Sequence, residues 1–424
     1  MNYAPEMAGV GRYTGEIGEH LARSGNTVEV VTAIPHYPGW KVAPSYRNGR
    51  YVREQLGGAA VLRCPLVLRE RMGGLWRFVA PLSFAASSAP VALWRALRLR
   101  PEVILCVEPT LMAAPVALFA AWLVGAKAAL HVQDLEVDAA FAVRHLARKP
   151  WLQRIAKRCE AALLRRFDRV ITISGRMGEA LVGKAVEAER IAIVRNWVDL
   201  DIIKPLERES AYRDELALEP RDRVVLYSGN IGLKQGFDDV IAAAALLAGR
   251  GDIKFVIAGE GPAKASLAAL AAPLRNVRFL PFQPYERLSE FLGLADLHVL
   301  PQAADAADLV LPSKLGGMLA SGRRIVLTAA AGTELATFAS GAAIIVPPAD
   351  VGALAAAIER AVDDARPDPD GASFRRRLAE RLAKTDGLRR FEALIGRWEP
   401  IAAPRGAAVA GRPVAVGPSS EATG

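Results

Sequence analysis

Short runs of apolar and β-branched residues alternate along the chain with longer stretches in which apolar residues recur every three or four positions. In the first half, the short runs occupy residues 28–32, 102–107, 128–132, 169–174 and 190–196. Such runs are typical of strands buried on both faces, and the three- to four-residue spacing is typical of helices. The alternation predicts an α/β fold with a doubly wound parallel sheet.

A polar connector interrupts this alternation after Trp197, and the alternation then resumes. The later runs occupy residues 224–230, 254–261, 277–282, 297–302, 324–328 and 342–348. Because 424 residues exceed one ordinary core, we expect two Rossmann-like domains. The expected parts are an N-terminal domain, a linker, a C-terminal domain, a helix packing back towards the first domain and a disordered low-complexity tail, at residues 1–200, 201–220, 221–385, 386–400 and 401–424.

The chain opens with NYAPEMAGVGRYTGE, a glycine loop that leads into a helix with an apolar face at Val10, Tyr13, Ile17 and Leu21. In a doubly wound sheet, such a loop follows the carboxyl end of a strand. No residues for that strand precede the loop. We therefore expect the first strand of the domain to be missing, through a start codon placed too far downstream or a truncated gene.

The net charge of +9, with a calculated pI near 9.6, favours an anionic partner. Nucleic acid is not the expected partner, because the basic residues are thinly spread and no RRM, zinc-finger or helix-turn-helix signature is present. Three scattered cysteines fit reduced thiols, and the start has no secretory signal pattern. We expect a cytoplasmic protein.

One basic cluster is more localised. Six arginines flank the apolar stretch LWRFVAPLSFAASSAPVALW, at positions 69, 71, 77, 95, 98 and 100. The pattern fits a helix pair whose apolar face meets an anionic membrane surface, and it equally fits a core helix with solvated arginines at its ends. The apolar stretch 111–132 is nearly long enough to span a bilayer, but Gly125 and Lys127 divide it into a helix and a strand. We therefore expect a buried crossover there.

Two loops of the second half combine glycine or serine with lysine at the end of a predicted strand. In LYSGNIGLKQGFDDVI, Gly229 and Gly232 allow close backbone approach, and Lys234 can reach a phosphate as a point charge. An ordinary strand–helix turn with a surface lysine is the alternative. In LVLPSKLGGMLASG, we expect Ser313 to cap a helix whose first turn contains Lys314. A lysine there opposes the helix dipole unless an anion is bound beside it.

Two other motifs are weaker. Gly9, Gly11 and Gly15 form GxGxxxG, but the next strand ends without the acidic residue that a dinucleotide ribose needs, so an NAD oxidoreductase is not expected. Asp199 and Asp201 spell DxD, a metal–diphosphate signature. This DxD lies at the domain linker, and we expect no metal there.

Several motifs, in order, resemble the retaining glycosyltransferases of family 4, which have the GT-B fold. They are NYAPEMAGVGRYTGE, TAIPHYPGW, HVQDLEVDA, RNWVDLD, YSGNIGLKQGF, AGEGP, LVLPSKLGGMLASG and AGTELA. The likeness covers nearly the whole chain and is closest to a subgroup active in exopolysaccharide synthesis. It implies two Rossmann-like domains that face a central cleft.

The resemblance also implies roles for particular residues. His131 would line the sugar and acceptor side of the cleft, and Lys234 would bind the diphosphate, as the two catalytic residues. Asn196 and Asp199 match an element at the domain junction and would be architectural. The donor-binding residues would be Gly9, Gly11, Asn230, Lys234, Asp308, Ser313, Lys314 and Glu334.

The chain departs from the family pattern at one pair of residues. Many members carry two glutamates seven residues apart, and the corresponding positions here are Leu309 and Gly317. Asp308 is adjacent and could substitute for the first. The arginine that often accompanies the lysine is also absent, with Asn230 near its place.

Two functions follow from these features. In the first, the protein is a retaining enzyme without a metal or other cofactor. It moves a hexose from a nucleotide-diphosphate sugar to a lipid-linked or growing exopolysaccharide or cell-surface glycan, at the inner face of the membrane. In the second, it is a truncated, catalytically silent homologue that binds nucleotide or scaffolds polysaccharide assembly. The retained lysines favour the first function, and the missing strand and glutamates favour the second.

Overall fold

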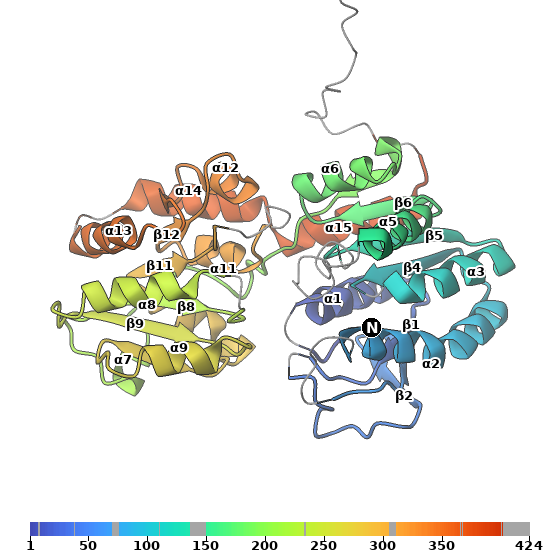
Figure 1. The fold of residues 1–424 in the computed structure, drawn as a ribbon, viewed down its shortest axis with the longest axis horizontal. Coiled ribbons are helices and arrows are strands. Elements are labelled where there is room, and N and C mark those ends of the chain that lie inside the picture. Colours follow the sequence, from blue (N-terminus) through green and yellow to red (C-terminus); the bar gives the residue numbers. More distant parts are fainter. Residues whose placement is uncertain are drawn as a thin grey trace, which may run out of the picture.

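The structure, a computed structural model, describes two α/β domains that lie side by side (Figure 1). The described residues are 1–6, 9–37, 39–69, 76–109, 111–135, 150–232, 235–304, 311–364, 366, 368–399 and 401. The expected low-complexity tail beyond residue 401 therefore lies outside the described residues.

The N-terminal domain contains two sheets. A three-stranded sheet has the order β1-β3-β2, and a four-stranded parallel sheet has the order β4-β5-β6-β7. Their strands are β1 (Glu29–Ala33), β2 (Val52–Leu56), β3 (Ala59–Cys64), β4 (Val103–Glu108), β5 (Lys127–Val132), β6 (Arg169–Thr172) and β7 (Ile191–Ile193). The helices are α1 (Val10–Arg23), α2 (Trp76–Leu99), α3 (Ala114–Val124), α5 (Pro150–Leu164) and α6 (Gly175–Gly183).

The first residues of the chain lie against the end of β1. The carbonyl of Met1 accepts hydrogen bonds from the backbone N–H of Ala33 and from the Thr32 hydroxyl. Within the described residues, β1 and β4 are each the edge strand of their own sheet. The fully buried Arg63 guanidinium of β3 ties this region together by donating to the carbonyls of Ala4 and Ala33.

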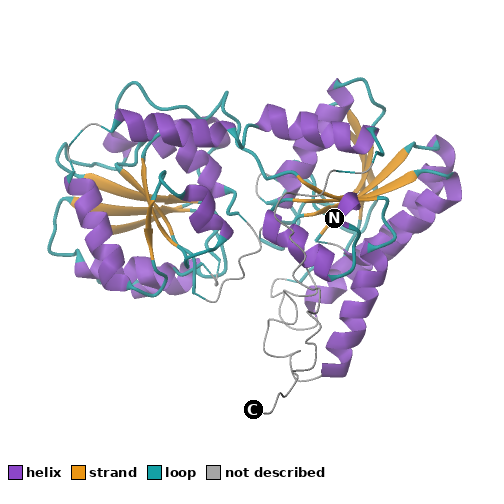
Figure 2. Cartoon of the chain, turned by 90° about the horizontal axis from the view of Figure 1, so that it is seen from above, coloured by secondary structure: helices purple, strands orange, loops and turns teal. Residues whose placement is uncertain are grey.

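The C-terminal domain is built on one six-stranded parallel sheet with the order β10-β9-β8-β11-β12-β13, enclosed by helices on both faces (Figure 2). The strands are β8 (Arg223–Ser228), β9 (Ile253–Ala258), β10 (Val277–Leu280), β11 (Leu297–Leu300), β12 (Arg324–Thr328) and β13 (Ile344–Val346). The helices are α7 (Tyr212–Glu215), α8 (Phe237–Leu246), α9 (Lys264–Leu270), α10 (Leu288–Gly293), α11 (Lys314–Ala320), α12 (Glu334–Ala339), α13 (Val351–Asp363) and α14 (Pro369–Glu380). In such sheets, ligands bind at the carboxyl ends of the strands, where the order reverses between β8 and β11.

The last helix, α15 (Lys384–Gly396), returns to the N-terminal domain. Its buried residues Leu388 and Phe391 share a core cluster with Tyr13 of α1 and Ile171 of β6. The guanidinium of Arg169 then fixes the end of the helix by donating to the carbonyls of Leu394, Arg397 and Glu399. The chain thus crosses between the domains twice.

The predicted parallel α/β fold is confirmed, and every strand predicted from an apolar run is present. The hairpin of β2 and β3 was not predicted. Within the described residues 76–99 the expected helix pair is wrong, because α2 continues unbroken through Pro81 and Pro90. The described helices include none that is long and apolar enough to cross a bilayer.

The helix–strand division of residues 111–132 is also confirmed, since Gly125 ends α3 in a left-handed conformation before β5 begins. The expectation that this crossover is buried is wrong. The outer face of α3 is open to solvent, with Trp122 75% exposed. The inner face of α3 packs on the sheet through Ala114 and Ala121.

Candidate active site

The two loops singled out in the second half meet at the carboxyl end of β8. Gly229, with φ near +150°, follows that strand, and a Cβ atom at this position would overlap the side chain of Lys314. The lysine at the start of α11 therefore lies directly across the backbone of residues 228–230, called the SGN loop below. Only glycine leaves room for this arrangement without displacing the lysine.

Lys314 is a half-buried cation without a carboxylate partner among the residues that the structure describes. Its Nζ lies 5.3 Å from the centre of the Tyr227 ring, a cation–π contact. Burial lowers the pKa of Lys314 to about 8, because the charged form loses water and no anion replaces it. Lys314 is therefore well placed to receive an anion.

Tyr227 also helps to fix the conformation of the SGN loop. Its hydroxyl donates to the carbonyl of Asn230 at 2.6 Å, and the side-chain oxygen of Gln235 accepts from the N–H of Gly232 at 3.1 Å. The sequence prediction passed over Tyr227. Its position as the penultimate residue of a strand that ends at a glycine loop was the available signal.

A second glycine loop lies beneath the first. Cβ atoms at Gly259 and Gly261 would overlap the carbonyl oxygens of Gly229 and Ile231. The N–H of Gly229 donates to Ala258, and the N–H of Ile231 donates to Glu260, each at 2.9 Å. The AGEGP motif thus supports the backbone of the SGN loop from the neighbouring strand β9.

Helix α1 of the N-terminal domain lies close to the start of α11. Tyr13 lies near the side chain of Ser313, and Arg12 donates to the Tyr285 hydroxyl at 3.3 Å. Ser313 does not cap α11 as predicted, because its backbone is already helical and its side chain makes no capping bond. Its side chain lies near Tyr13 of the other domain.

The glycine loop before α1 has a conformation that favours glycine, with φ +61° at Gly9. Gly11 faces inward, where a Cβ atom would overlap the side chain of Glu6. The Glu6 carboxylate accepts from the N–H groups of His36 and Tyr37, each at 2.9 Å. Packing against Glu6 therefore accounts for Gly11, and whether Gly9 and Gly11 also contact the donor stays a prediction.

His131 is the penultimate residue of β5, and its ring is buried. The ring lies 5.0 Å from that of Phe391 in α15, and its Nε2 lies 3.3 Å from the side-chain nitrogen of Gln133. Burial lowers the pKa of His131 to about 3, so the imidazole is neutral at physiological pH. Among the described residues, its Nδ1 has no hydrogen-bond partner. The predicted catalytic role of His131 stays a prediction.

Glu334 lies at an interdomain contact. Its carboxylate accepts from the N–H groups of Gly175 and Arg176 at the start of α6, at 3.3 and 3.2 Å, and from the Arg195 guanidinium at 2.8 Å. Arg176 returns a bond to the carbonyl of Gly332. The sequence prediction missed Arg195, although it directly precedes the predicted junction residue Asn196.

Ion pairs and hydrogen bonds stabilise the junction between the two domains. Lys384 donates to Asp199 at 3.0 Å and lies 3.5 Å from Glu16 of α1, and the Trp197 indole donates to the same glutamate. Hydrogen bonds and the charge of Lys384 outweigh burial and lower the pKa of Asp199. Both Asp199 carboxylate oxygens are thus engaged by protein groups, one by Lys384 and the other by the N–H of Asp201. Asn196 donates to Gln133 at 3.1 Å.

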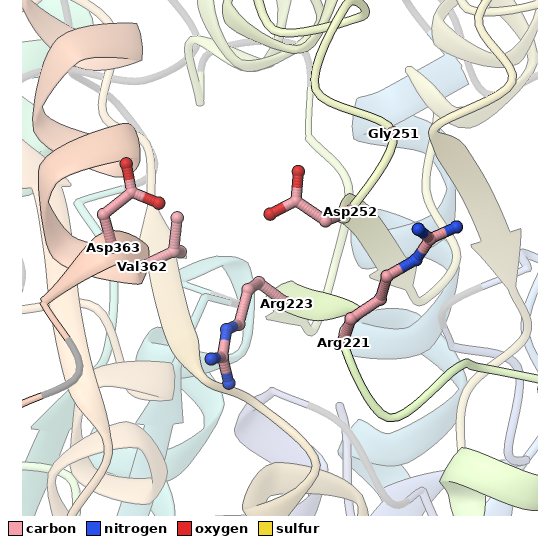
Figure 3. Close-up of a pocket in the computed structure, with 6 residues that line it drawn as sticks. All are labelled: Arg221, Arg223, Gly251, Asp252, Val362 and Asp363. Carbon is pink, nitrogen blue, oxygen red and sulfur yellow. The ribbon is translucent and has the colours of Figure 1, made fainter.

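The structure thus brings four predicted residues to one edge, namely Gly229 with its neighbour Asn230, and Ser313 with Lys314. Lys234 and Asp308 fall within residues 233–234 and 305–310, which lie outside the described residues. A cavity of about 520 Å³ lies elsewhere, lined by charged residues including Arg223, Asp252 and Asp363 (Figure 3). Arg223 is the first residue of β8, so this cavity is at the opposite end of the sheet.

Comparison with known proteins agrees with the resemblance seen in the motifs. Residues 8–197 match the family profile of the glycosyl transferase 4-like domain, and residues 209–384 match that of glycosyl transferases group 1. The chain is 39% identical over 402 residues to the putative colanic acid biosynthesis glycosyl transferase WcaI of Escherichia coli (strain K12), covering 92% of this chain and 97% of WcaI. It is 31% identical over 237 residues to alpha-D-kanosaminyltransferase of Streptomyces kanamyceticus, covering 54% and 58%.

Solved structures share the fold at low sequence identity. The complex of Anabaena Alr3699/HepE with UDP and glucose has a TM-score of 0.64 and 15% identity, covering 88% of this chain and 100% of that one. Sucrose-phosphate synthase from Thermosynechococcus elongatus has a TM-score of 0.63 and 17% identity, covering 92% and 91%. The predicted GT-B architecture is confirmed. The chain belongs to the group 1 glycosyltransferases of family 4, enzymes of the GT-B fold.

Proposed function

We propose that this glycosyltransferase moves a hexose from a nucleotide-diphosphate sugar to a lipid-linked or growing exopolysaccharide acceptor, with retention of configuration. The observation that carries the proposal is Lys314, a half-buried lysine without a carboxylate partner in the described part of the chain, held across the glycine loop after β8. The relative named for colanic acid biosynthesis, which nearly the whole chain resembles, supports a polysaccharide acceptor. The HepE complex with UDP-glucose supports a UDP-sugar donor.

In the proposed reaction, the donor diphosphate lies against the SGN loop and Lys314. The bond between the anomeric carbon and the diphosphate breaks, and a bond from the same face to an acceptor hydroxyl oxygen forms. The hydroxyl proton passes to an oxygen of the leaving diphosphate, so the reaction needs no dedicated side-chain base. The role of Lys314 is to stabilise the charge that grows on the departing phosphate, the kind of preorganised electrostatic effect that contributes much of enzymatic catalysis.

The test is calorimetric titration with UDP and with GDP. Replacement of Lys314 by methionine keeps most of the apolar volume over Tyr227 and removes the charge. A charge-assisted contact is worth roughly 1.5–3 kcal/mol, so Lys314→Met should weaken binding by about ten- to a hundredfold. Lys234→Ala tests the other predicted lysine in the same way, and Lys254→Ala, near the opposite end of β9, is the matched control.

Binding of one nucleotide that is lost in Lys314→Met and kept in Lys254→Ala would support the proposal and name the donor class. If a demonstrably folded protein binds neither UDP nor GDP, the catalytically silent homologue becomes the better account. Equal binding by the wild type and Lys314→Met would remove Lys314 from the donor site.

A further inference from the structure

The outer face of α2 is apolar over most of its length. Its exposed positions include Leu82, Ala86, Pro90, Trp94 and Leu97, which are spaced four or three residues apart and therefore form one stripe. Leu82, Trp94 and Leu97 each expose slightly more than half of their surface. At 1.5 Å per residue the stripe is about 22 Å long. A surface helix normally turns its polar face outward, so this stripe is unusual.

Helix α3 packs beside α2 and has the same character. Pro115, Phe119, Trp122 and Leu123 are exposed, and the rings of Phe119 and Trp122 are stacked with centres 5.6 Å apart. No residue of α3 is charged. Both helices lie at the end of the N-terminal domain that is remote from the C-terminal domain (Figure 1). This surface is therefore separate from the loops at β8.

The charges around this surface are positive. Neither α2 nor α3 contains an aspartate or glutamate. At the end of α2, Arg98 lies 5.7 Å from the Trp94 ring, and neither Arg98 nor Arg100 is ion-paired to any residue that the structure describes. Arg95 is paired with Glu29 of β1. The surface thus combines exposed tryptophans with arginines that are free to bind anions.

We infer that the α2–α3 surface docks onto the surface of an anionic lipid bilayer. Tryptophan is favoured at the boundary between lipid headgroups and acyl chains, and arginine binds lipid phosphates, so Trp94, Trp122 and Arg98 match an interface of this kind. A second copy of the chain is a poorer match. In a two-fold dimer the same arginines would face one another without acidic residues from either helix to pair with them.

Membrane docking does not depend on the identity of the donor or acceptor, so it can hold or fail independently of the proposed transfer reaction. It places the enzyme at the membrane without a spanning helix. The N-terminal domain would rest on the bilayer through α2 and α3, and the C-terminal domain, at the other end of the molecule, would stay in solution (Figure 1).

The test is co-sedimentation of the full chain with vesicles of phosphatidylcholine alone and of phosphatidylcholine mixed with phosphatidylglycerol. Binding is expected to the mixed vesicles and to weaken as salt is added. Arg98→Gln with Arg100→Gln should weaken binding roughly twenty-five-fold, since each basic residue near an anionic surface contributes about fivefold. Trp94→Ala with Trp122→Ala should also weaken binding to the mixed vesicles.

Matched controls come from the C-terminal domain and the linker, where Leu246→Ala with Leu270→Ala removes exposed apolar residues and Arg208→Gln with Arg221→Gln removes exposed charges. The circular dichroism and thermal unfolding of each variant report whether it is folded, and these measurements are independent of both vesicle binding and nucleotide binding. The inference is overturned if the wild type sediments with neither vesicle, or if the α2–α3 variants bind as the wild type does. A dimer in solution that Trp94→Ala with Trp122→Ala dissociates, without vesicle binding, would assign the surface to a second copy.

Discussion

At the scale of single residues, the site depends on one lysine in a costly environment. Lys314 loses water on burial and gains only the face of Tyr227 in return, so its ammonium is stabilised less than in solution. A phosphate group would supply the missing charge. The lysine and the glycine that makes room for it are 85 residues apart in sequence and are in contact in the fold.

This environment predicts a pH dependence of nucleotide binding. Burial lowers the pKa of Lys314 from 10.5 to about 8, and a bound diphosphate should raise it again by stabilising the ammonium. Binding above pH 8 must therefore take up a proton. The affinity should fall by up to about tenfold per pH unit above 8, since the phosphates are already ionised there. Calorimetry in buffers of different ionisation enthalpy measures both the affinity and the proton uptake.

The pH dependence of the stability of the unliganded protein has the opposite sign to that of nucleotide affinity. The unfolded chain holds the Lys314 proton more tightly than the folded protein does, so the unliganded protein should gain stability from this group between about pH 8 and about pH 10.5. Lys314→Met should abolish both the fall in nucleotide affinity above pH 8 and the gain in stability between about pH 8 and about pH 10.5. A wild type whose affinity is flat from about pH 7 to about pH 9.5 would contradict the assignment of Lys314 to the phosphate site.

Sequence patterns predicted which residues lie at the site better than they predicted which groups those residues contact. Gly229, Asn230, Ser313 and Lys314 were selected because parallel strands end at one edge, and the fold places them there. The approach of Ser313 to Tyr13 could not be predicted, because it depends on how two domains meet. For the same reason the contact of Glu334 with the start of α6 carries no local signal in AGTELA.

At the scale of elements, the apolar runs predicted the parallel strands because these are buried on both faces. The β2–β3 hairpin was missed because it is short and antiparallel, and its burial alternates in β2. Gly57 and Gly58, both with positive φ, were the available turn signal. The exposed face of α3 was not predictable, since a helix that is apolar all round normally indicates burial.

Helix α1 gives a prediction at this scale. Alanine normally replaces glycine inside a helix with a gain of about 0.5–1 kcal/mol. In α1, a Cβ atom at Gly15 would lie 2.7 Å from the Cβ of Ala4, because residues 1–6 pack directly on this face. Gly15→Ala should therefore destabilise the protein by about 1–3 kcal/mol, the cost of overpacking. Urea unfolding measures the change.

The matched control is Gly352→Ala in the first turn of α13, where a Cβ atom would make only an ordinary contact, 3.8 Å from Asp350. This substitution should leave stability unchanged or raise it by up to about 1 kcal/mol. A gain in stability at Gly15 equal to that at Gly352 would show that residues 1–6 do not pack on α1 in solution.

At the scale of the whole molecule, side chains from both domains hold the two together. Glu334 of the C-terminal domain binds the start of α6 and Arg195. Arg12 of α1 binds Tyr285, and Lys384 joins Glu16 to Asp199. These contacts include residues of the two chain crossings, Asp199 and Lys384, so they help to set how closely the domains approach each other.

Glu334→Ala tests this arrangement. The carboxylate makes charge-assisted bonds to Gly175, Arg176 and Arg195 of the N-terminal domain, and such bonds are worth roughly 1.5–3 kcal/mol. Their loss should open the domains, which small-angle X-ray scattering would detect as a larger radius of gyration. Nucleotide affinity should change by less than about twofold, because the loops at β8 and α11 stay intact, and turnover should fall about tenfold or more, because the acceptor side is no longer positioned.

The outcome separates two roles for Glu334. If this residue binds the nucleotide or sugar, as the family resemblance implies, affinity for the nucleotide sugar falls together with turnover and the radius of gyration stays constant. If it holds the domains together, turnover and radius change while nucleotide affinity does not. Glu187→Ala is the matched control, since Glu187 is an exposed carboxylate whose ion pair with Arg190 stays within the N-terminal domain. Its loss should leave all three measurements unchanged, because it removes a surface charge and leaves the contact between the domains intact.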